Sequence, residues 1–517
     1  MKRRWEVAAY VVLVAAALAV RLIGLGDRPF HHDESQDAYF SWLFWTRGDY
    51  EYQPILHGPL RFYLTALMYV LFGDTDFTAR LAPALMGTLM VPLPALLRGQ
   101  LGRLGAFAAA VALAFGPAFL YYGRFAREDI YFACITLALL AVTFRFLERP
   151  RRHQPALIGV LLALSFATKE TTFISVFVFG TFLIVALIAQ ARAAGGLRQA
   201  PIVRSVVAVG WEAWVWGLAA FALVFTLLFT VFLTDPAGLW AGIHDGLDYW
   251  LAQHGPGRGE KEWWFYLVVL VAEEWPALLL GAVGAAVALR RPTLLRLFLI
   301  WDFVLSLAVY SWANERFSWL VLHPLLPLLL LAGLGVQAIW DARARLAGRL
   351  GMVVVALCAL HAGYASFRAN AENGSDPREF LVTTQSSKAV KRVRDEVLAV
   401  AERARREGRE PVIAVDSADG STFPWAWYFR DLPVGYVDLS VGDLPSGTDA
   451  AIITDANRDR LLGRLAGYDG REFPFRVWWV RDYGAMSPRG WWRWYRHREP
   501  WNPTGGLPEW LYLRQGA

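Results

Sequence analysis

Long apolar stretches recur along the first two-thirds of the chain, each ending in a short polar segment. A helix needs about 20 mostly apolar residues to cross the hydrocarbon core of a bilayer. The pattern predicts eleven membrane-spanning helices. They are Val7–Leu25, Phe77–Leu97, Ala106–Tyr122, Ile130–Leu147, Ala156–Thr168, Thr172–Gln190, Trp211–Leu233, Trp275–Leu289, Leu294–Trp312, Ser318–Val336 and Gly351–Phe367.

The charges between these stretches predict how the helices are oriented. Basic clusters occur in alternate loops: Lys2, Arg3 and Arg4; Arg98 and Arg103; Arg149, Arg151 and Arg152; Arg192, Arg198 and Arg204; Arg290, Arg291 and Arg296; Arg343, Arg345 and Arg349. Basic loops stay on the cytoplasmic side of a membrane. The sequence therefore predicts a plasma-membrane protein with a cytoplasmic N-terminus and the other loops outside.

The pattern changes after Phe367. A charged helical stretch, "KAVKRVRDEVLAVAERARREG", is followed by short β-rich runs such as "PVIAVDS", "PVGYVDLS", "DAAIITD" and "FRVWWVRDY". Strands that alternate with helical stretches are typical of an α/β domain. We expect a transmembrane domain over residues 1–367 and a small extracytoplasmic α/β domain over residues 368–517.

Composition agrees with this fold class. Of the 517 residues, 56% are hydrophobic and only 19% are charged, whereas soluble domains are about 25% charged. The chain is thus predicted to be a polytopic α-helical membrane protein. The formal net charge of +6 needs no nucleic-acid partner, because the arginines lie where topology requires them.

Ionisable residues gather in the loops on the predicted outer side. They are Asp33, Glu34, Asp37 and His57 in the first loop; Arg124, Arg127, Glu128 and Asp129 in the second; Lys169 and Glu170 in the third; His244, Asp245, Asp248 and His254 in the fourth; and Glu315 and Arg316 in the fifth. Such residues near a membrane are costly and commonly mark a functional site. Ion pairing at the water interface explains Glu170 or Arg316 alone equally well.

The segment "FHHDES" is harder to explain structurally. Asp33 and Glu34 are adjacent carboxylates flanked by histidines, directly after the first apolar stretch. The apolar pattern shows no helix there for them to cap, so we expect a chemical role.

These residue types suit transfer of a group from a phosphate. A carboxylate takes a proton from a hydroxyl nucleophile, and arginine or lysine holds a phosphate. A divalent ion is also compatible with the acids and histidines, and the candidate ligands are Asp33, Asp129, His57, His244 and Glu315. No nucleotide-binding fingerprint is present, so we expect no nucleotide cofactor. An activated sugar outside the cell would then arrive on a polyprenyl phosphate.

Several motifs resemble the GT-C superfamily of membrane glycosyltransferases, which includes protein O-mannosyltransferases, aminoarabinose transferases and oligosaccharyltransferase. The matching segments are "HHDES", "HGPL", "RFARED", "GVLLALSFATKETTF", "NERFSWLVLHPLLPLLLLAG" and "FPWAWYFRD". Within the superfamily, "HHDES" and "HGPL" are most similar to a prokaryotic family associated with flippase activity in archaeal-type N-glycosylation. The W-W-D-x-G acceptor motif of the asparagine-directed enzymes is absent from the sequence, which argues against sequon glycosylation.

The resemblance implies an inverting enzyme that uses a polyprenyl-phosphate sugar donor and a glycan, lipid or protein acceptor. Asp33 would be the general base and Glu34 an orienting residue or metal ligand. Glu128 and Asp129 would form a second acidic site. The phosphate would be held by Arg124, Arg127, Lys169 and Arg316.

Two other functions fit the same membrane pattern. A flippase for lipid-linked sugars would need alternating access, which commonly rests on repeated halves and broken spans near mid-membrane. The sequence shows no repeated halves, and its charges lie at the outer ends of the spans. A scaffold in a glycan-assembly complex would use the acids only in ion pairs.

Overall fold

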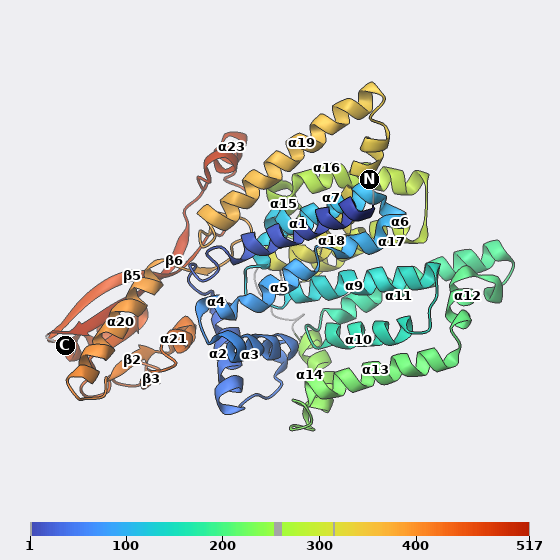
Figure 1. The fold of residues 1–517 in the computed structure, drawn as a ribbon. Helices are drawn as coiled ribbons and strands as arrows, with labels where there is room; N and C mark the ends of the chain where they lie inside the picture. The colour runs from blue at the N-terminus through green and yellow to red at the C-terminus, as the bar shows by residue number, and fades with distance from the viewer. Residues whose placement is uncertain (1–2, 253–260, 314–315, 516–517) are drawn as a thin grey trace. The chain divides into compact units, whose positions relative to one another are not determined.

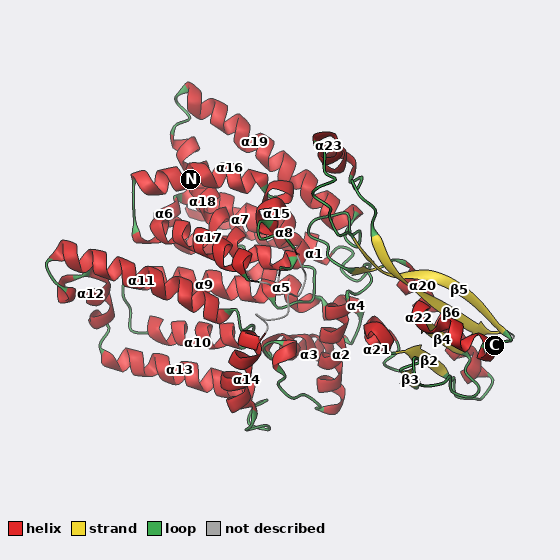
Figure 2. Cartoon of the chain, turned by 180° about the vertical axis from the view of Figure 1, so that it is seen from behind, coloured by secondary structure: helices red, strands yellow, loops and turns green. Residues whose placement is uncertain are grey.

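The computed structural model describes residues 3–252, 261–313 and 316–515, and the chain forms two compact units (Figures 1 and 2). The first unit contains residues 1–23, 48–68 and 80–372. The second contains residues 24–47, 69–79 and 373–517. The chain therefore contributes two N-terminal segments to the unit that is completed by its C-terminal third.

The first unit is helical. Its helices are α1 (Arg3–Leu22), α3 (Leu60–Phe72, whose last turn belongs to the second unit), α5 (Leu81–Leu89), α6 (Arg98–Leu101), α7 (Arg103–Phe115), α8 (Pro117–Tyr122), α9 (Asp129–Glu148), α10 (Gln154–Phe166), α11 (Thr172–Ala194), α12 (Pro201–Ala208), α13 (Trp211–Phe229), α14 (Gly238–Ala252), α15 (Phe265–Glu273), α16 (Trp275–Arg290), α17 (Leu294–Trp312), α18 (Leu322–Asp341) and α19 (Leu346–Phe367). Short 3-10 segments are η1 (Pro54–Leu56), η2 (Leu93–Leu97), η3 (Leu197–Gln199) and η4 (Ser318–Val321), and a π turn, η5 (Arg368–Glu372), follows α19.

Many of these helices are long and apolar enough to cross a membrane. Among the described residues there are 8 such helical segments, or 9 when α15 and α16, which meet at a bend of 100°, count as one broken span. Three shorter apolar helices, α3, α7 and α10, add to them. Each of the eleven predicted ranges coincides with helical structure, so the polytopic helical fold is confirmed, although fewer helices than predicted reach spanning length.

Helix α18 forms the centre of the first unit. All its residues from Leu322 to Val336 are buried, and it packs against α7, α16 and α17. Glycines permit the close approach: a side chain on Gly284 of α16 would strike the carbonyl oxygen of Leu331, and one on Gly105 of α7 would strike that of Gly333. Small residues at such crossings are the usual basis of tight helix packing in membranes.

The second unit is built on a mixed sheet. Its elements are α2 (His32–Arg47), α4 (Asp76–Ala79), β1 (Gln385–Ser386), α20 (Ala389–Arg406), β2 (Ile413–Asp416), η6 (Ala418–Gly420), α21 (Thr422–Tyr428), β3 (Val434–Val437), β4 (Ala450–Thr454), α22 (Asp455–Leu461), η7 (Leu462–Arg464), β5 (Tyr468–Trp478), α23 (Pro488–His497) and β6 (Gly505–Arg514). The strand order is β1-β5-β6-β4-β2-β3. Strand β2 pairs in parallel with β3 and β4, and the pairs β4–β6, β5–β6 and β1–β5 are antiparallel.

The sequence of each central strand explains its position. Strands β2 and β4 are short, apolar except for their last residues, Asp416 and Thr454, and buried along their whole length, as expected for strands covered on both faces. The strands that the structure describes all come from residues 385–514 (Figure 2). The predicted C-terminal α/β domain is therefore present, with the predicted helix matching α20.

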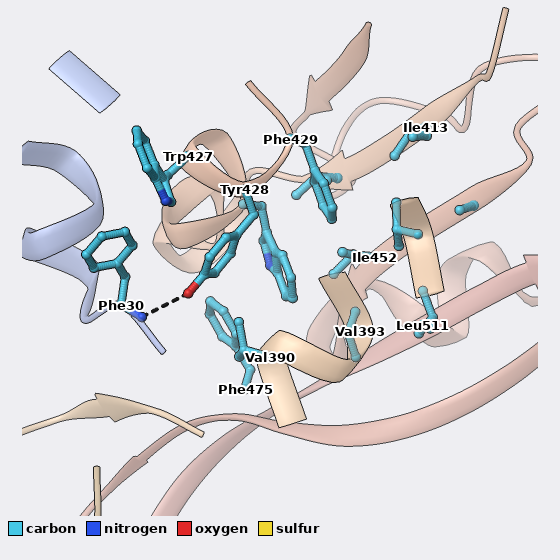
Figure 3. Close-up of a cluster of buried hydrophobic side chains, with 14 of the residues drawn as sticks. Phe30, Val390, Val393, Ile413, Trp427, Tyr428, Phe429, Ile452, Phe475 and Leu511 are labelled. Carbon is cyan, nitrogen blue, oxygen red and sulfur yellow. Dashed lines mark hydrogen bonds between the residues drawn. The ribbon is translucent and has the colours of Figure 1, made fainter. Parts of the chain in front are cut away.

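One apolar core explains why N-terminal segments belong to this unit. Trp425 and Trp427 of α21 are fully buried, in a cluster that also contains Phe30 and Tyr69. Figure 3 shows Trp427 beside Phe30. The backbone N–H of Phe30 donates to the Tyr428 hydroxyl at 3.0 Å. A boundary at residue 367 separates side chains that pack together, so the predicted linear division into 1–367 and 368–517 differs from the observed one.

Candidate functional site

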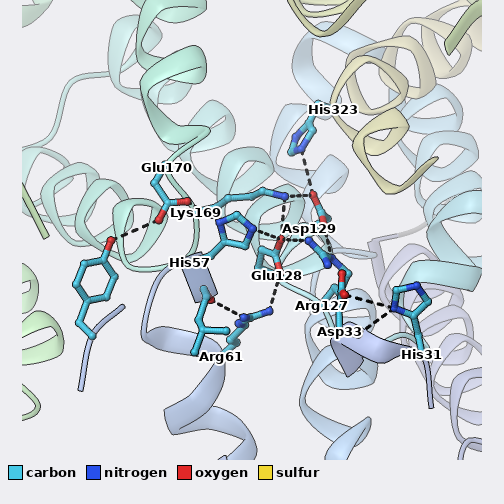
Figure 4. Close-up of polar contacts among 12 residues, drawn as sticks. His31, Asp33, His57, Arg61, Arg127, Glu128, Asp129, Lys169, Glu170 and His323 are labelled. Atoms are coloured by element: carbon cyan, nitrogen blue, oxygen red, sulfur yellow. Dashed lines mark hydrogen bonds and ion pairs between the residues drawn. The ribbon is translucent and has the colours of Figure 1, made fainter. Parts of the chain in front are cut away.

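A buried polar cluster lies in the first unit, where several of its helices begin (Figure 4). We call it the acid–base cluster, and its members are His57, Arg61, Arg127, Glu128, Asp129, Lys169, Glu170 and His323. They come from the loop before α3, the first turns of α3 and α18, the segment before α9 together with its first residue, and the turn between α10 and α11. Three separate predicted loops are thus brought together with the start of a central span.

Glu128 is the centre of the cluster and is fully buried. One carboxylate oxygen accepts from Lys169 Nζ at 2.8 Å and from Arg127 Nη2 at 2.9 Å. The other accepts from Arg61 Nη1 at 2.8 Å. Charged hydrogen bonds of this kind are stronger than neutral ones, so Glu128 holds three cations in one place.

Asp129 shares a cation with Glu128. Lys169 Nζ lies 2.8 Å from Asp129 Oδ1, and His323 Nε2 lies 3.5 Å from the same oxygen. The His323 ring stacks on Tyr310 of α17, with ring centres 4.7 Å apart. Lys169 therefore bridges the two adjacent acids at the start of α9.

His57 lies between the carboxylates of Glu128 and Glu170. Its Nδ1 lies 2.7 Å from Glu170 Oε2, and its Nε2 lies 3.5 Å from Glu128 Oε1. The hydroxyl of Tyr52 donates to Glu170 at 3.4 Å. The loop and the α10–α11 turn are thus joined through side chains.

Gly58 allows this loop to come close enough. Its N–H donates to the Thr168 carbonyl at 3.2 Å, and the Leu60 N–H donates to the Ala167 carbonyl at 2.8 Å. A Cβ atom on Gly58 would overlap the Ala167 carbonyl group. Because Gly58 has no side chain, the loop can approach the α10–α11 turn closely, and His57 and Arg61 reach the other members of the cluster.

The balance of charge decides what the cluster attracts. Three permanent cations, Arg61, Arg127 and Lys169, face three carboxylates, those of Glu128, Asp129 and Glu170. Burial alone raises the pKa of Glu128, but the surrounding cations outweigh this and hold the pKa well below its usual range. The carboxylate is therefore charged.

His57 and Lys169 respond to the same carboxylates. Burial alone lowers the pKa of His57, yet the charges of Glu128 and Glu170 outweigh burial and raise it above its ordinary value. The pKa of Lys169 is likewise raised, because Asp129 and Glu128 outweigh the effect of burial. Protonation of His57 would add one positive charge to an otherwise balanced group, which favours an anionic ligand such as a phosphate.

Asp33 and Glu34 lie in the second unit, in the first turn of α2. Glu34 is fully buried, and one of its oxygens accepts from the His31 N–H at 3.1 Å. Its other oxygen accepts from Arg28 Nη2 at 3.2 Å. A glutamate that reaches back from the third helical position is one half of a capping box.

This geometry corrects one argument from the sequence. The pattern predicted no helix for the acidic pair to cap, but α2 begins at His32 and Glu34 caps it. The contacts of Glu34 thus favour a structural role and not a metal-ligand role. Asp33 differs, because its side chain is 27% exposed at the start of the helix.

The predicted phosphate-binding arginines occupy different places. Arg127 belongs to the acid–base cluster, and its guanidinium also lies over the Trp319 ring at 4.1 Å. Arg124 donates to the Ile23 carbonyl at 2.7 Å. Arg316 donates to the Ser311 carbonyl at 3.1 Å, at the end of α17, and to the Lys261 carbonyl.

The candidate metal ligands do not form one group among the residues that the structure describes, where no three His, Cys, Asp or Glu side chains are arranged to hold a metal ion. His57 and Asp129 face members of the acid–base cluster, and His244 on α14 lies 3.1 Å from Asp245. Asp33 is part of the second unit, and Glu315 lies outside the described residues. A requirement for a metal ion stays a prediction.

Sequence reasoning missed two members of the cluster, Arg61 and His323. Arg61 follows the "HGPL" motif directly, and His323 is a polar residue inside the apolar run "LVLHPLLPLLLL". A histidine at membrane depth is costly and commonly functional, so the second signal was available. The sequence left simple ion pairing and a functional role equally open for Glu170, and the structure places this residue in contact with His57 within the cluster.

Comparisons with known proteins show which families and folds the chain is similar to. The family described as dolichyl-phosphate-mannose-protein mannosyltransferase matches residues 56–200, a range that contains most of the cluster. A curated relative from Pseudomonas fluorescens, undecaprenyl phosphate-alpha-4-amino-4-deoxy-L-arabinose arabinosyl transferase 2, is 28% identical over 286 residues. The match covers 53% of this chain and 45% of that protein, so the chain spans less than half the length of this relative.

Solved structures extend the similarity over nearly the whole chain. ArnT from Cupriavidus metallidurans bound to undecaprenyl phosphate has a TM-score of 0.61 at 17% identity and covers 97% of both chains. The archaeal oligosaccharyltransferase AglB from Archaeoglobus fulgidus, in complex with an inhibitory peptide and a dolichol-phosphate, has a TM-score of 0.55 at 13% identity. That match covers 83% of this chain and 60% of AglB. These matches show that the chain shares its overall fold with ArnT and AglB.

Proposed function

We propose that the protein is a membrane glycosyltransferase that moves a sugar from a polyprenyl-phosphate donor to an acceptor hydroxyl. The observation that carries this proposal is the position of Lys169 between Glu128 and Asp129, with Arg61 and Arg127 on the same carboxylate. Such a group of buried cations suits a phosphate. The fold supports the same activity, because the similar ArnT structure is bound to undecaprenyl phosphate.

The phosphate would be held by cations of the acid–base cluster. Lys169 acts as a point charge, and Arg127 offers a planar fork of donors. A protonated His57 gives the cluster the net positive charge that an anionic donor needs. Arg124 and Arg316 are further candidates, and the guanidinium group of each donates to a backbone carbonyl.

Asp33 would act as the general base. The acceptor oxygen forms a bond to the anomeric carbon of the sugar while the bond from that carbon to the phosphate oxygen breaks. The acceptor proton passes to the Asp33 carboxylate, and the polyprenyl phosphate leaves with the bonding electron pair. A single displacement of this kind inverts the anomeric configuration. Glu34 keeps the first turn of α2 in place for Asp33.

The membrane orientation follows from the loop charges. Six basic clusters in alternate loops support a cytoplasmic N-terminus. The loops that carry the acid–base cluster, together with the C-terminal α/β domain, then face outward. A donor attached to a lipid and a glycan, lipid or protein acceptor both fit that location.

The test is transfer of radiolabelled sugar by the purified full-length protein. It is supplied with a panel of polyprenyl-phosphate sugars and a membrane extract as acceptor, with and without a chelator. Appearance of label on an acceptor supports the proposal, and the chelator arm decides whether a divalent ion is needed. Movement of the lipid across vesicles without any transfer would instead support a flippase.

A variant connects the activity to the cluster. Lys169→Gln removes the bridging cation, so the KM for the donor should rise more than kcat falls. Lys169→Arg retains the charge and should recover part of the donor affinity. Unchanged donor KM in Lys169→Gln would contradict phosphate binding at this cluster.

A further inference from the structure

Helix α23, from Pro488 to His497, carries an unusual outer face. Its exposed residues Arg489, Trp492, Arg493 and Arg496 follow one another at spacings of three, four and seven positions from the first. Residues at these spacings share one side of a helix. Trp492 is 57% exposed although it is the largest side chain on that side, and its ring stacks on Tyr495 with centres 6.0 Å apart.

The opposite face is firmly packed within the second unit. Trp494 is fully buried, and its indole N–H donates to the Arg378 carbonyl at 2.8 Å. Its ring meets Phe380 edge to face at 4.6 Å. Arg498, directly after the helix, pairs with the buried Glu379 at 2.8 Å. The orientation of α23 is therefore fixed, and its cationic face is held outward.

The residues that α23 packs on follow closely in sequence after a predicted membrane span. The last apolar span ends at Glu372, and Arg378 to Phe380 are the residues on which α23 packs. The segment from Asn373 to Arg378 can extend to at most about 22 Å. Covalent connection therefore limits how far α23 can lie from the point where the chain leaves the bilayer.

We infer that α23 binds the surface of the bilayer through anionic lipid headgroups. Indole rings favour the headgroup level of a membrane, and arginines near an anionic surface are attracted to it. An amphipathic helix with basic and aromatic residues on its free side is typical of interfacial binding. A neutral glycan would use the indole but would not require three arginines around it, so charge complementarity favours lipid.

The test places a fluorescent probe on the outer side of the helix. His497→Cys is labelled in the full-length protein, which is simple because Cys134 and Cys358 are buried. The protein is reconstituted in phosphatidylcholine nanodiscs with or without phosphatidylglycerol, and lipids with a nitroxide headgroup serve as quencher. Quenching should be stronger in the anionic discs. Each of Arg489→Ala, Arg493→Ala and Arg496→Ala should reduce the ratio of lipid-bound to unbound helix roughly fivefold.

Matched controls test whether the dependence on anionic lipid is specific to α23. A probe at Val441→Cys, 80% exposed in the same unit, should show no dependence on anionic lipid. Arg405→Ala and Arg406→Ala, on the exposed side of α20, should leave quenching at residue 497 unchanged. Equal quenching in both disc types, or none in either, would overturn the inference. Quenching that an added glycan abolishes in both disc types would overturn it in favour of sugar binding.

Discussion

Gly58 has no side chain at the point where the loop before α3 crosses the turn between α10 and α11. Two backbone hydrogen bonds join these segments there. The side chains of His57 and Arg61 leave the same loop toward Glu170 and Glu128. At this scale, the acid–base cluster depends on a backbone contact as much as on its charges.

Gly58→Ala should therefore weaken both folding and donor binding. The added methyl group meets the Ala167 carbonyl, and overpacking of this kind costs about 1–3 kcal/mol. The melting temperature in detergent should fall, and the donor KM should rise. Gly180→Ala on α11 is the control, because a side chain there meets no atom within 4 Å. Identical behaviour of the two variants would show that the Gly58 contact is unimportant.

Sequence reasoning identified most acids and bases of the cluster but missed Arg61 and His323. Glu128, Asp129, Lys169 and Arg127 were predicted from loop position and residue type, and the structure places them in contact. Their roles in catalysis stay predictions. The helix that Glu34 caps was not predicted, because its first turns are polar and show no periodic pattern of apolar residues.

At the scale of elements, hydrophobic length was the strongest signal. Each predicted span coincides with helical structure, because a bilayer allows few alternatives to a helix. Helix α3 was missed since its apolar run is short and follows the "HGPL" turn. Strand β6 was missed because it begins with Gly505, Gly506 and Pro508, and glycine and proline are uncommon inside strands. Its place between β5 and β4 is set by pairing far along the chain.

The packing of α18 gives a prediction at this scale. Gly284→Val on α16 would drive a side chain into the Leu331 carbonyl of α18, so the melting temperature should fall by an amount equivalent to about 1–3 kcal/mol. Gly363→Val on α19 is matched in chemistry and meets no atom within 4 Å. Thermal unfolding of both purified variants compares the two directly, and equal losses would refute the packing argument.

At the scale of the whole molecule, the chain is not divided at one point. Residues 24–47 and 69–79 join residues 373–517 in one unit. Specific contacts hold them there: Trp427 Nε1 donates to Asp76 at 2.9 Å, and Arg430 pairs with Asp74 at 2.8 Å. Composition and periodicity report only local properties, so a boundary drawn from them could not include such distant pairing.

This unit should respond to pH through Glu509 of β6. The side chain is fully buried and accepts from the Trp425 indole at 3.1 Å. Burial raises the pKa of Glu509 to about 8, although the hydrogen bonds from Ser421 and Trp425 and the charge of Arg476 oppose this rise. Since the folded state holds this proton more tightly than the unfolded state, the stabilisation is complete below the ordinary pKa and is lost as pH rises toward 8.

The expected loss is up to about 1.4 kcal/mol per pH unit in that range. Thermal unfolding followed by tryptophan fluorescence from about pH 4 to about pH 9, a range that brackets the ordinary and the raised glutamate pKa, measures it. Glu509→Gln stays neutral and should flatten the dependence. A wild-type profile that rises steadily toward pH 9 would contradict this assignment.

The most direct test of the proposed activity is sugar transfer by Asp33→Asn. With the donor that wild type uses, the variant should lose about 10²- to 10⁴-fold in kcat, because a positioned base contributes that much. Donor binding should be retained, since the phosphate-holding residues are unchanged, and Glu34→Gln provides a comparison in the same helix turn. A variant that binds donor but transfers no sugar would confirm Asp33 as the base. Transfer at the wild-type rate would contradict the account.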